Sequence, residues 1–120
     1  MAKKMVVFCG SDEPMKAFPP FMLGAGAIAM DMELMMFFTM KGLNIVRKGG
    51  AEKIKLEGAP KSLPEFIDIA REAKAQLVAC SAVFPIVGCT EEDLIEGVEC
   101  GGVATFVDEA EEADIVLTFC

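Results

Sequence analysis

The sequence predicts an α/β domain in which helices cover both faces of a parallel β-sheet. Short apolar runs alternate with helix-like segments along the whole chain, which is the pattern of parallel strands joined by crossover helices. Several of these runs are apolar without interruption, as expected of strands that are buried on both faces. The chain has 120 residues, enough for one domain with one hydrophobic core and not for two. We therefore expect a single domain over residues 1–120.

The first third of the chain contains two predicted strands with an unusually apolar helix between them. Residues 5–9 form the first strand, and residues 34–39 form the second, which is apolar on both faces and therefore central. The pair Pro19-Pro20 suits the first turn of a helix that should continue to about residue 31. Its segment 21–30 is apolar all round, and such a helix is buried on every side. In so small a domain, one side of this helix should contact another subunit.

The middle of the chain carries most of the lysines and forms a long connection. Residues 40–48 predict a short helix that Gly49 and Gly50 end, and residues 49–61 predict an irregular loop. The segment Ser62-Leu-Pro-Glu65 is a capping box with proline in the first turn, so it opens a helix that ends near residue 74.

The last third of the chain supplies three further strands. Residues 76–80 form the third strand, because Leu77-Val78-Ala79 is a short apolar run without helical periodicity. The remaining elements are, in order, a short helical turn or loop over 81–87, a short helix over 90–96, a strand over 98–100, a helix over 103–113 and a strand over 115–120.

Four of the five cysteines end predicted strands, namely Cys9, Cys80, Cys100 and Cys120. The carboxyl ends of parallel strands share the edge of the sheet at which ligands bind and chemistry occurs. Cysteines that serve only as core residues have no reason to gather at that edge, so the pattern favours thiol chemistry. Cys89, in the loop after the third strand, could lie near the same edge.

Cys80 has the best setting of these cysteines. It follows a buried strand and precedes a helical turn, whose N-terminus favours a thiolate. Cys100 ranks second, because Gly101 and Gly102 lead into a helix N-terminus that could hold an anion. The alternative is that Cys80 is a small buried hydrophobic residue, as most free cysteines are.

Composition and residue spacing argue against several other kinds of site. The chain has no histidine, the commonest zinc ligand and general base. It has no Cys-x-x-Cys, which argues against a metal centre, an iron–sulfur cluster and disulfide oxidoreductase chemistry. No Gly-x-Gly-x-x-Gly or Walker motif follows a strand, which argues against dinucleotides and nucleoside triphosphates. We therefore expect neither a metal nor another cofactor.

Charge and hydropathy limit the partners and the location of the protein. The net charge of −8 argues against nucleic acid as a partner. The longest apolar run, over residues 17–30, is too short to span a bilayer, so we expect no membrane span. Five cysteines is an odd number, and without a secretory signal it fits a cytoplasmic protein better than a disulfide-linked one.

Three stretches resemble the DsrE/DsrF/DsrH-like family, and in particular its small stand-alone members: residues 36–48, residues 77–82 (Leu-Val-Ala-Cys-Ser-Ala) and residues 92–106, with Gly-Val-Glu-Cys-Gly-Gly-Val-Ala-Thr-Phe at the end of the last. The resemblance covers essentially the whole chain. It implies a three-layer α/β/α sandwich whose five parallel strands have the order 4-3-2-1-5, and it implies oligomers. In active family members a cysteine after the third strand carries sulfur as a persulfide, and Cys80 matches that position. Residues 81–89 depart from the family pattern.

Two functional hypotheses follow from this resemblance. In the first, the protein is a sulfur carrier or sulfurtransferase: the Cys80 thiolate takes up sulfane sulfur and passes it to an acceptor thiol. Ser81 either donates a hydrogen bond to the resulting anion or acts only as a helix N-cap. In the second, the chain is a non-catalytic oligomeric subunit or adaptor of a sulfur-metabolism complex, and its cysteines are inert. The expected partners are further copies of the chain and a small sulfur-carrier protein.

The lysines of the long connection predict a further part of the site. Thr39 ends the second strand and lies beside Cys80 in the implied strand order, so the loop 49–61 could overhang the cysteines. Lys53 and Lys55 would then attract anionic sulfur species or an acidic partner. The alternative is a solvated loop that is remote from them.

Overall fold

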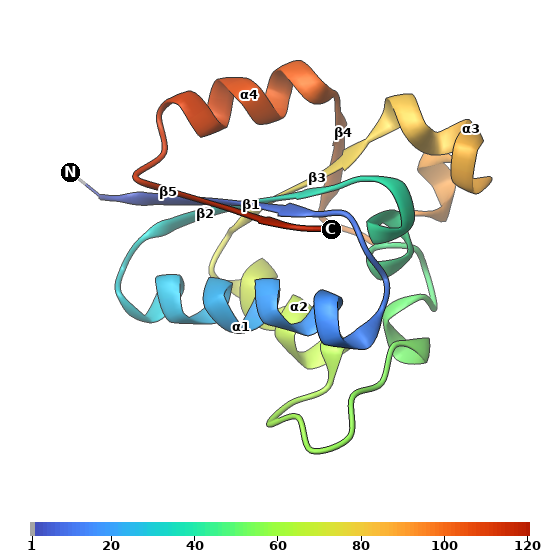
Figure 1. The fold of residues 1–120 in the computed structure, drawn as a ribbon, viewed down its shortest axis with the longest axis horizontal. Helices are drawn as coiled ribbons and strands as arrows, with labels where there is room; N and C mark the ends of the chain where they lie inside the picture. Colours follow the sequence, from blue (N-terminus) through green and yellow to red (C-terminus); the bar gives the residue numbers. More distant parts are fainter. Residues whose placement is uncertain (1) are drawn as a thin grey trace.

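The computed structural model describes residues 2–120, in which strands and helices alternate along the chain (Figure 1). The strands are β1 (Lys4–Cys9), β2 (Glu33–Phe38), β3 (Gln76–Cys80), β4 (Val98–Gly101) and β5 (Ile115–Phe119). The α-helices are α1 (Pro14–Ala29), α2 (Leu63–Glu72), α3 (Phe84–Val87) and α4 (Val103–Glu111). Short 3-10 helices occupy parts of the connections: η1 (Met40–Ile45), η2 (Ala51–Lys53), η3 (Ser81–Val83) and η4 (Glu91–Asp93).

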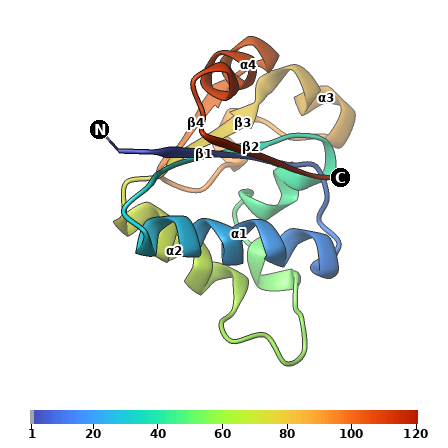
Figure 2. The ribbon, with the colours of Figure 1, turned by 60° about the vertical axis from the view of Figure 1, so that its left-hand side comes forward.

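The five strands form one parallel sheet with the order β4-β3-β2-β1-β5, which confirms the predicted order. Helices α1 and α2 cover one face, which we call the α1 face, and α4 covers the other, which we call the α4 face (Figures 1 and 2). Helix α3 stands at the carboxyl end of β3, on the same side of the sheet as α4. The fold is therefore the predicted three-layer α/β/α arrangement.

Aromatic contacts hold both helical layers against the central strands. On the α1 face, Phe21 of α1 stacks on Phe38 of β2 with ring centroids 6.0 Å apart. On the α4 face, Phe106 of α4 packs against Phe8 and Phe37 at centroid distances of 5.5 and 5.2 Å. Because β2 is covered from both sides, its sequence is apolar without the alternation of a half-exposed strand.

Helix α1 begins at Pro14, earlier than the predicted start at Pro19. Pro14 lies in the first turn, where the missing N–H is not needed. Pro19 and Pro20 lie inside the helix, where each proline removes an intrahelical hydrogen bond. The helix continues through them because Phe18 and Phe21 are buried in the core, and tertiary packing of this kind overrides local propensity.

The remaining elements agree with their predictions except for two helices, which are shorter. The capping box that opens α2 is present: Glu65 N donates to Ser62 Oγ at 3.2 Å, and Ser62 N donates to Glu65 Oε1 at 3.0 Å. The predicted helices over 40–48 and 90–96 are only the 3-10 helices η1 and η4. Helix η4 stops because Ile95 N donates to Val46 O at 2.9 Å instead of continuing a helix.

One side of α1 is exposed, so this helix is not buried on every side within one chain. Met22, Leu23 and Met30 are 45%, 44% and 77% exposed. Together with Met5 and Ile115 they line an apolar hollow of about 1040 Å³, which we call the α1–β5 groove. Within residues 2–120, no helix combines the length and the hydropathy that crossing a membrane requires.

We expect Leu23→Glu to convert an oligomer of this chain into monomers. The α1–β5 groove is apolar and borders the edge strand β5, and surfaces of this kind are commonly covered by protein. Among residues 2–120, Asp31 and Asp114 already line the groove with a single lysine, Lys3, so a further carboxylate buried there would be poorly compensated and would cost several kcal/mol. Light scattering at micromolar concentration should show several chains before the change and one after it, while Lys55→Glu on the exposed loop leaves the mass unchanged. A monomeric unaltered protein would contradict the prediction.

Candidate functional site

The parallel pairing of β3 and β4 places their carboxyl ends side by side. The connection that follows β3 returns along the α1 face, where Arg71 of α2 donates to Glu96 O at 2.8 Å. The connection that follows β4 is α4, which covers the opposite face. Ligands of open α/β sheets bind outside the carboxyl ends of the strands. In the register of the sheet, Cys80 lies beside Gly101 at this point.

The Cys80 thiol points to the α4 face and is almost completely buried. Cys80 is 1% exposed, and it shares a face with Val78 because side chains alternate along a strand. Val78 lies under α4, close to Thr105 of that helix across Gly101. Thr39 continues β2 in an extended conformation, is buried, and lies on the same face at the register position beside Cys80. The structure therefore brings Thr39, Cys80 and Gly101 together.

Gly101 allows α4 to approach the sheet closely at the carboxyl end of β4. A Cβ atom on this residue would lie 2.7 Å from Val78 Cγ1 and 3.1 Å from Thr105 Oγ1. The next residue, Gly102, donates its backbone N–H to Thr105 Oγ1 at 3.3 Å. The Ser81 hydroxyl donates to Gly101 O at 3.2 Å and so ties β3 to β4, and the N-cap of η3 is Cys80 and not Ser81. A hydrogen bond from Ser81 to a sulfur anion on Cys80 stays a prediction.

The other cysteines share this edge of the sheet, but their thiols do not converge on Cys80. Cys9 lies at the register position of Phe38 and therefore points to the α1 face, where burial raises the pKa of its thiol. Cys100 is level with Ala79 and points away from the α4 face. Partial burial raises the pKa of Cys100, and Glu91 and Cys89 add to this effect. Cys120 is exposed after β5.

These placements leave no metal site among the described residues. Within residues 2–120, no group of three or more cysteine, aspartate or glutamate side chains is arranged to hold a metal ion. Within these residues the five thiols therefore form no metal-binding cluster.

The loop 49–61 lies on the α1 face of the sheet, whereas the Cys80 thiol points to the α4 face. It packs beside the start of α1 and the start of α2, where Lys55 and Phe18 line the same hollow (Figures 1 and 2). Lys53 lines a neighbouring hollow with Asp12. The loop takes this side because Ile54 is buried in the core of the α1 face. A role of Lys53 and Lys55 in anion docking stays a prediction.

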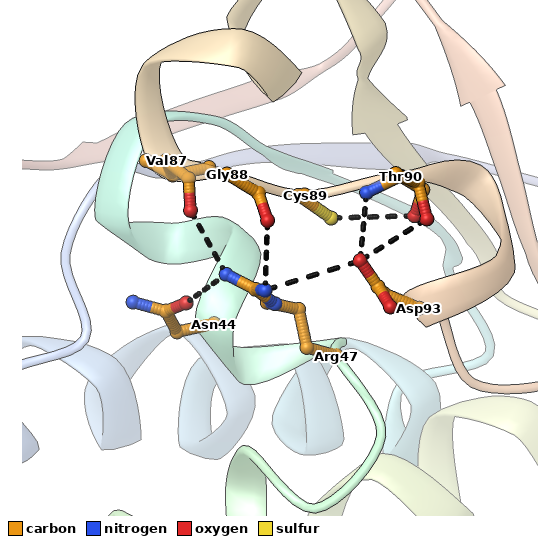
Figure 3. A network of polar contacts seen from close by, with 7 residues as sticks. All are labelled: Asn44, Arg47, Val87, Gly88, Cys89, Thr90 and Asp93. Atoms are coloured by element: carbon orange, nitrogen blue, oxygen red, sulfur yellow. Dashed lines mark hydrogen bonds and ion pairs between the residues drawn. The ribbon is translucent and has the colours of Figure 1, made fainter.

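Arg47 joins the connections that leave β2 and β3 (Figure 3). Its Nη1 donates to Val87 O at 3.0 Å and its Nη2 donates to Gly88 O at 3.1 Å, so both carbonyls lie at the end of α3. Nη1 also donates to Asn44 Oδ1 at 3.2 Å, and Nη2 lies 3.9 Å from Asp93 Oδ2. Sequence reasoning missed this residue as part of the site. A signal existed, because the chain has only two arginines among its eleven basic residues.

Cys89 and Asp93 complete this network. The Cys89 thiol donates to Thr90 O at 3.4 Å, and burial raises its pKa against the opposing effect of Arg47. The Asp93 carboxylate accepts hydrogen bonds from the backbone N–H and the hydroxyl of Thr90 at 2.8 and 3.1 Å. These bonds, and then Arg47 and Lys48, lower the pKa of Asp93, so it stays charged beside Arg47 at neutral pH.

Sequence comparisons identify a family and several proteins that are similar to this chain. A model of the DsrE/DsrF/DrsH-like family matches residues 1–62 and 52–118. The uncharacterized protein YrkE of Bacillus subtilis is 27% identical over 151 aligned residues, which cover 94% of this chain and 93% of YrkE. The sulfur carrier protein DsrE2 of Allochromatium vinosum is 25% identical over 155 aligned residues, which cover 96% of this chain and 97% of that protein.

Two solved structures share the fold. The crystal structure of the ychN protein from E. coli matches 99% of this chain and 100% of its own with a TM-score of 0.78 at 20% identity. The structure of MTH1491 from Methanobacterium thermoautotrophicum matches 97% of this chain and 98% of its own with a TM-score of 0.77 at 16% identity. These matches agree with the strand order and the layers described above.

Proposed function

The chain belongs to the DsrE/DsrF/DrsH-like family, and we therefore propose that it traffics sulfur by binding sulfane sulfur as a persulfide on Cys80 and passing it to an acceptor thiol. The observation that carries this proposal is the position of Cys80 at the carboxyl end of β3, beside the carboxyl end of β4. A relative named as a sulfur carrier supports the same chemistry.

The proposed chemistry needs no cofactor and no net oxidation. The Cys80 thiolate attacks the outer sulfur of a donor persulfide, R–S–SH, the S–S bond of the donor breaks, and the donor leaves as the thiolate R–S⁻. The new Cys80 persulfide loses its proton to solvent. An acceptor thiolate then attacks the outer sulfur, and Cys80 leaves as a thiolate. Each step exchanges one S–S bond for another, so the number of electrons is conserved.

The burial of Cys80 favours the second hypothesis, a non-catalytic subunit or adaptor. A thiol that is 1% exposed cannot be reached by a donor without a local opening of the structure. Cysteines of this kind commonly act as small core residues. The two hypotheses differ in whether Cys80 takes up sulfur at all.

Incubation with a sulfane-sulfur donor should add ~32 Da, the mass of one sulfur atom, to the peptide that contains Cys80. The adduct should disappear on reduction and in Cys80→Ser. Cys9→Ser and Cys120→Ser should keep it, because Cys9 is buried on the other face and Cys120 lies beyond β5. The donor is added to the folded protein, which is then digested, and mass spectrometry measures the mass of each cysteine-containing peptide. Equal labelling of all five cysteines, or labelling that survives Cys80→Ser, would favour the adaptor.

A further inference from the structure

One guanidinium group connects three loops at the carboxyl edge of the sheet. Arg47 follows β2, and it binds Val87 O and Gly88 O in the connection that follows β3. Asn44, which accepts from Arg47, donates through Nδ2 to Asp12 Oδ2 at 2.9 Å in the loop that follows β1. The backbone around Arg47 binds the β3 connection as well, since Lys48 N donates to Asp93 O at 2.7 Å.

The segment that Arg47 holds begins at Cys80. Residues 81–88 consist of η3, α3 and Gly88, and the two carbonyls bound by Arg47 lie at the far end of this segment. On the α4 face the Cys80 thiol has Thr39 and Gly101 at its sides and Val78 behind it in the same strand. Helix α4 covers this face from above, and at the carboxyl edge η3 and α3 follow Cys80 directly, with α3 on the α4 side of the sheet (Figures 1 and 2). Residues 81–88 take part in no strand pairing, so their movement would leave the sheet intact, whereas movement of α4 would break the packing of Phe106 on Phe8 and Phe37.

We propose that Arg47 is a positioning residue that controls access to Cys80 by holding residues 81–88 closed. The contacts of Arg47 exist whether or not Cys80 carries sulfur. Only the purpose of controlled access, the uptake of sulfur, rests on the proposed function. The geometry favours arginine over lysine: two nitrogens of one planar group reach two successive carbonyls, and a single ammonium cannot reproduce that fork. Asp93 balances the charge of the guanidinium from the other side.

The test is the rate at which iodoacetamide alkylates Cys80 in the folded protein, followed by peptide mass spectrometry. Arg47→Ala removes hydrogen bonds from a charged donor, and we expect Cys80 to react about tenfold faster. Arg47→Lys should give an intermediate rate, and methylguanidine added to Arg47→Ala should slow the reaction again. The rate at Cys9 should not change, because Cys9 is buried on the α1 face and reports on unfolding of the whole domain.

Arg71→Gln is the matched control, because Arg71 also donates to a backbone carbonyl but holds Glu96, outside residues 81–88. It should leave the alkylation of Cys80 unchanged. An unchanged Cys80 rate in Arg47→Ala, or an equal acceleration at Cys9, would overturn the inference. If Arg47→Ala does not fold, the alkylation rates of Arg47→Lys are used: an unchanged rate at Cys80, or an equal acceleration at Cys9, would overturn the inference. Alkylation needs no sulfur donor, so faster alkylation without persulfidation would remove the proposed function and leave the role of Arg47 intact.

Discussion

Replacing Gly42 by alanine should destabilise the protein by about 3 kcal/mol or more and lower its melting temperature by roughly 10–15 °C. Gly42 is buried in η1, directly against the end of β1. A Cβ atom there would lie 2.1 Å from the carbonyl oxygen of Cys9, and this neighbour is backbone that cannot turn away. The same oxygen accepts from Thr39 N at 3.1 Å, so its displacement would also disturb the pairing of β1 with β2.

Gly26→Ala is the control for this prediction. Gly26 lies in α1, and a Cβ atom there would meet nothing within 4 Å. Alanine should therefore stabilise the helix by about 0.5–1 kcal/mol, since glycine loses more chain entropy on folding. Thermal unfolding followed by circular dichroism separates the two variants. A Gly42→Ala protein that melts within a few degrees of the unaltered one would show that η1 can move away from β1 at little cost.

Replacing Phe106 by alanine should destabilise the protein by about 2–3 kcal/mol. Helix α4 has no fully buried residue, and the ring of Phe106 is its main contact with Phe8 and Phe37 of the sheet. The loss should also act on the carboxyl end of β4, because Thr105 precedes Phe106 and binds the N-cap residue Gly102. Hydrogen exchange should therefore rise over residues 98–111 before it rises elsewhere.

Val103→Ala serves as the comparison for Phe106→Ala. Val103 lies in α4 but is 63% exposed, so its loss should change the free energy of unfolding by less than about 0.5 kcal/mol. Chemical denaturation gives both values. Equal effects of the two substitutions would mean that packing against Phe8 and Phe37 does not hold α4 in place.

The buried strands can be predicted from the sequence because burial on both faces allows only apolar residues. A strand covered on both faces, such as residues 34–38, must be apolar throughout, and a run of that length is too short for a buried helix. The capping box at Ser62 is equally local, since its two hydrogen bonds join residues three apart. The strand order came from the family resemblance, because no local signal states which strands are neighbours.

What the sequence does not reveal depends on contacts between distant residues. The register of β1 and β3 decides that Cys9 and Cys80 point to opposite faces, and no local pattern sets that register. The start of α1 depends on the burial of Phe18 and Phe21, which outweighs two internal prolines. Arg47 finds its acceptors forty residues further along the chain, at Val87 and Gly88, so its role appears only in the folded protein.

The pairing of β5 with β1 has a consequence for the way the protein is made. Met5 of β1 lies beside Ile115 of β5, so one edge of β1 is covered by a strand that is synthesised much later. While the ribosome is still adding residues 115–119, one edge of β1 has no partner. An unpaired strand edge is open to pairing with other chains, and contacts between such distant residues form slowly. In the nascent chain this edge of β1 therefore stays open until β5 has been synthesised and can pair with it.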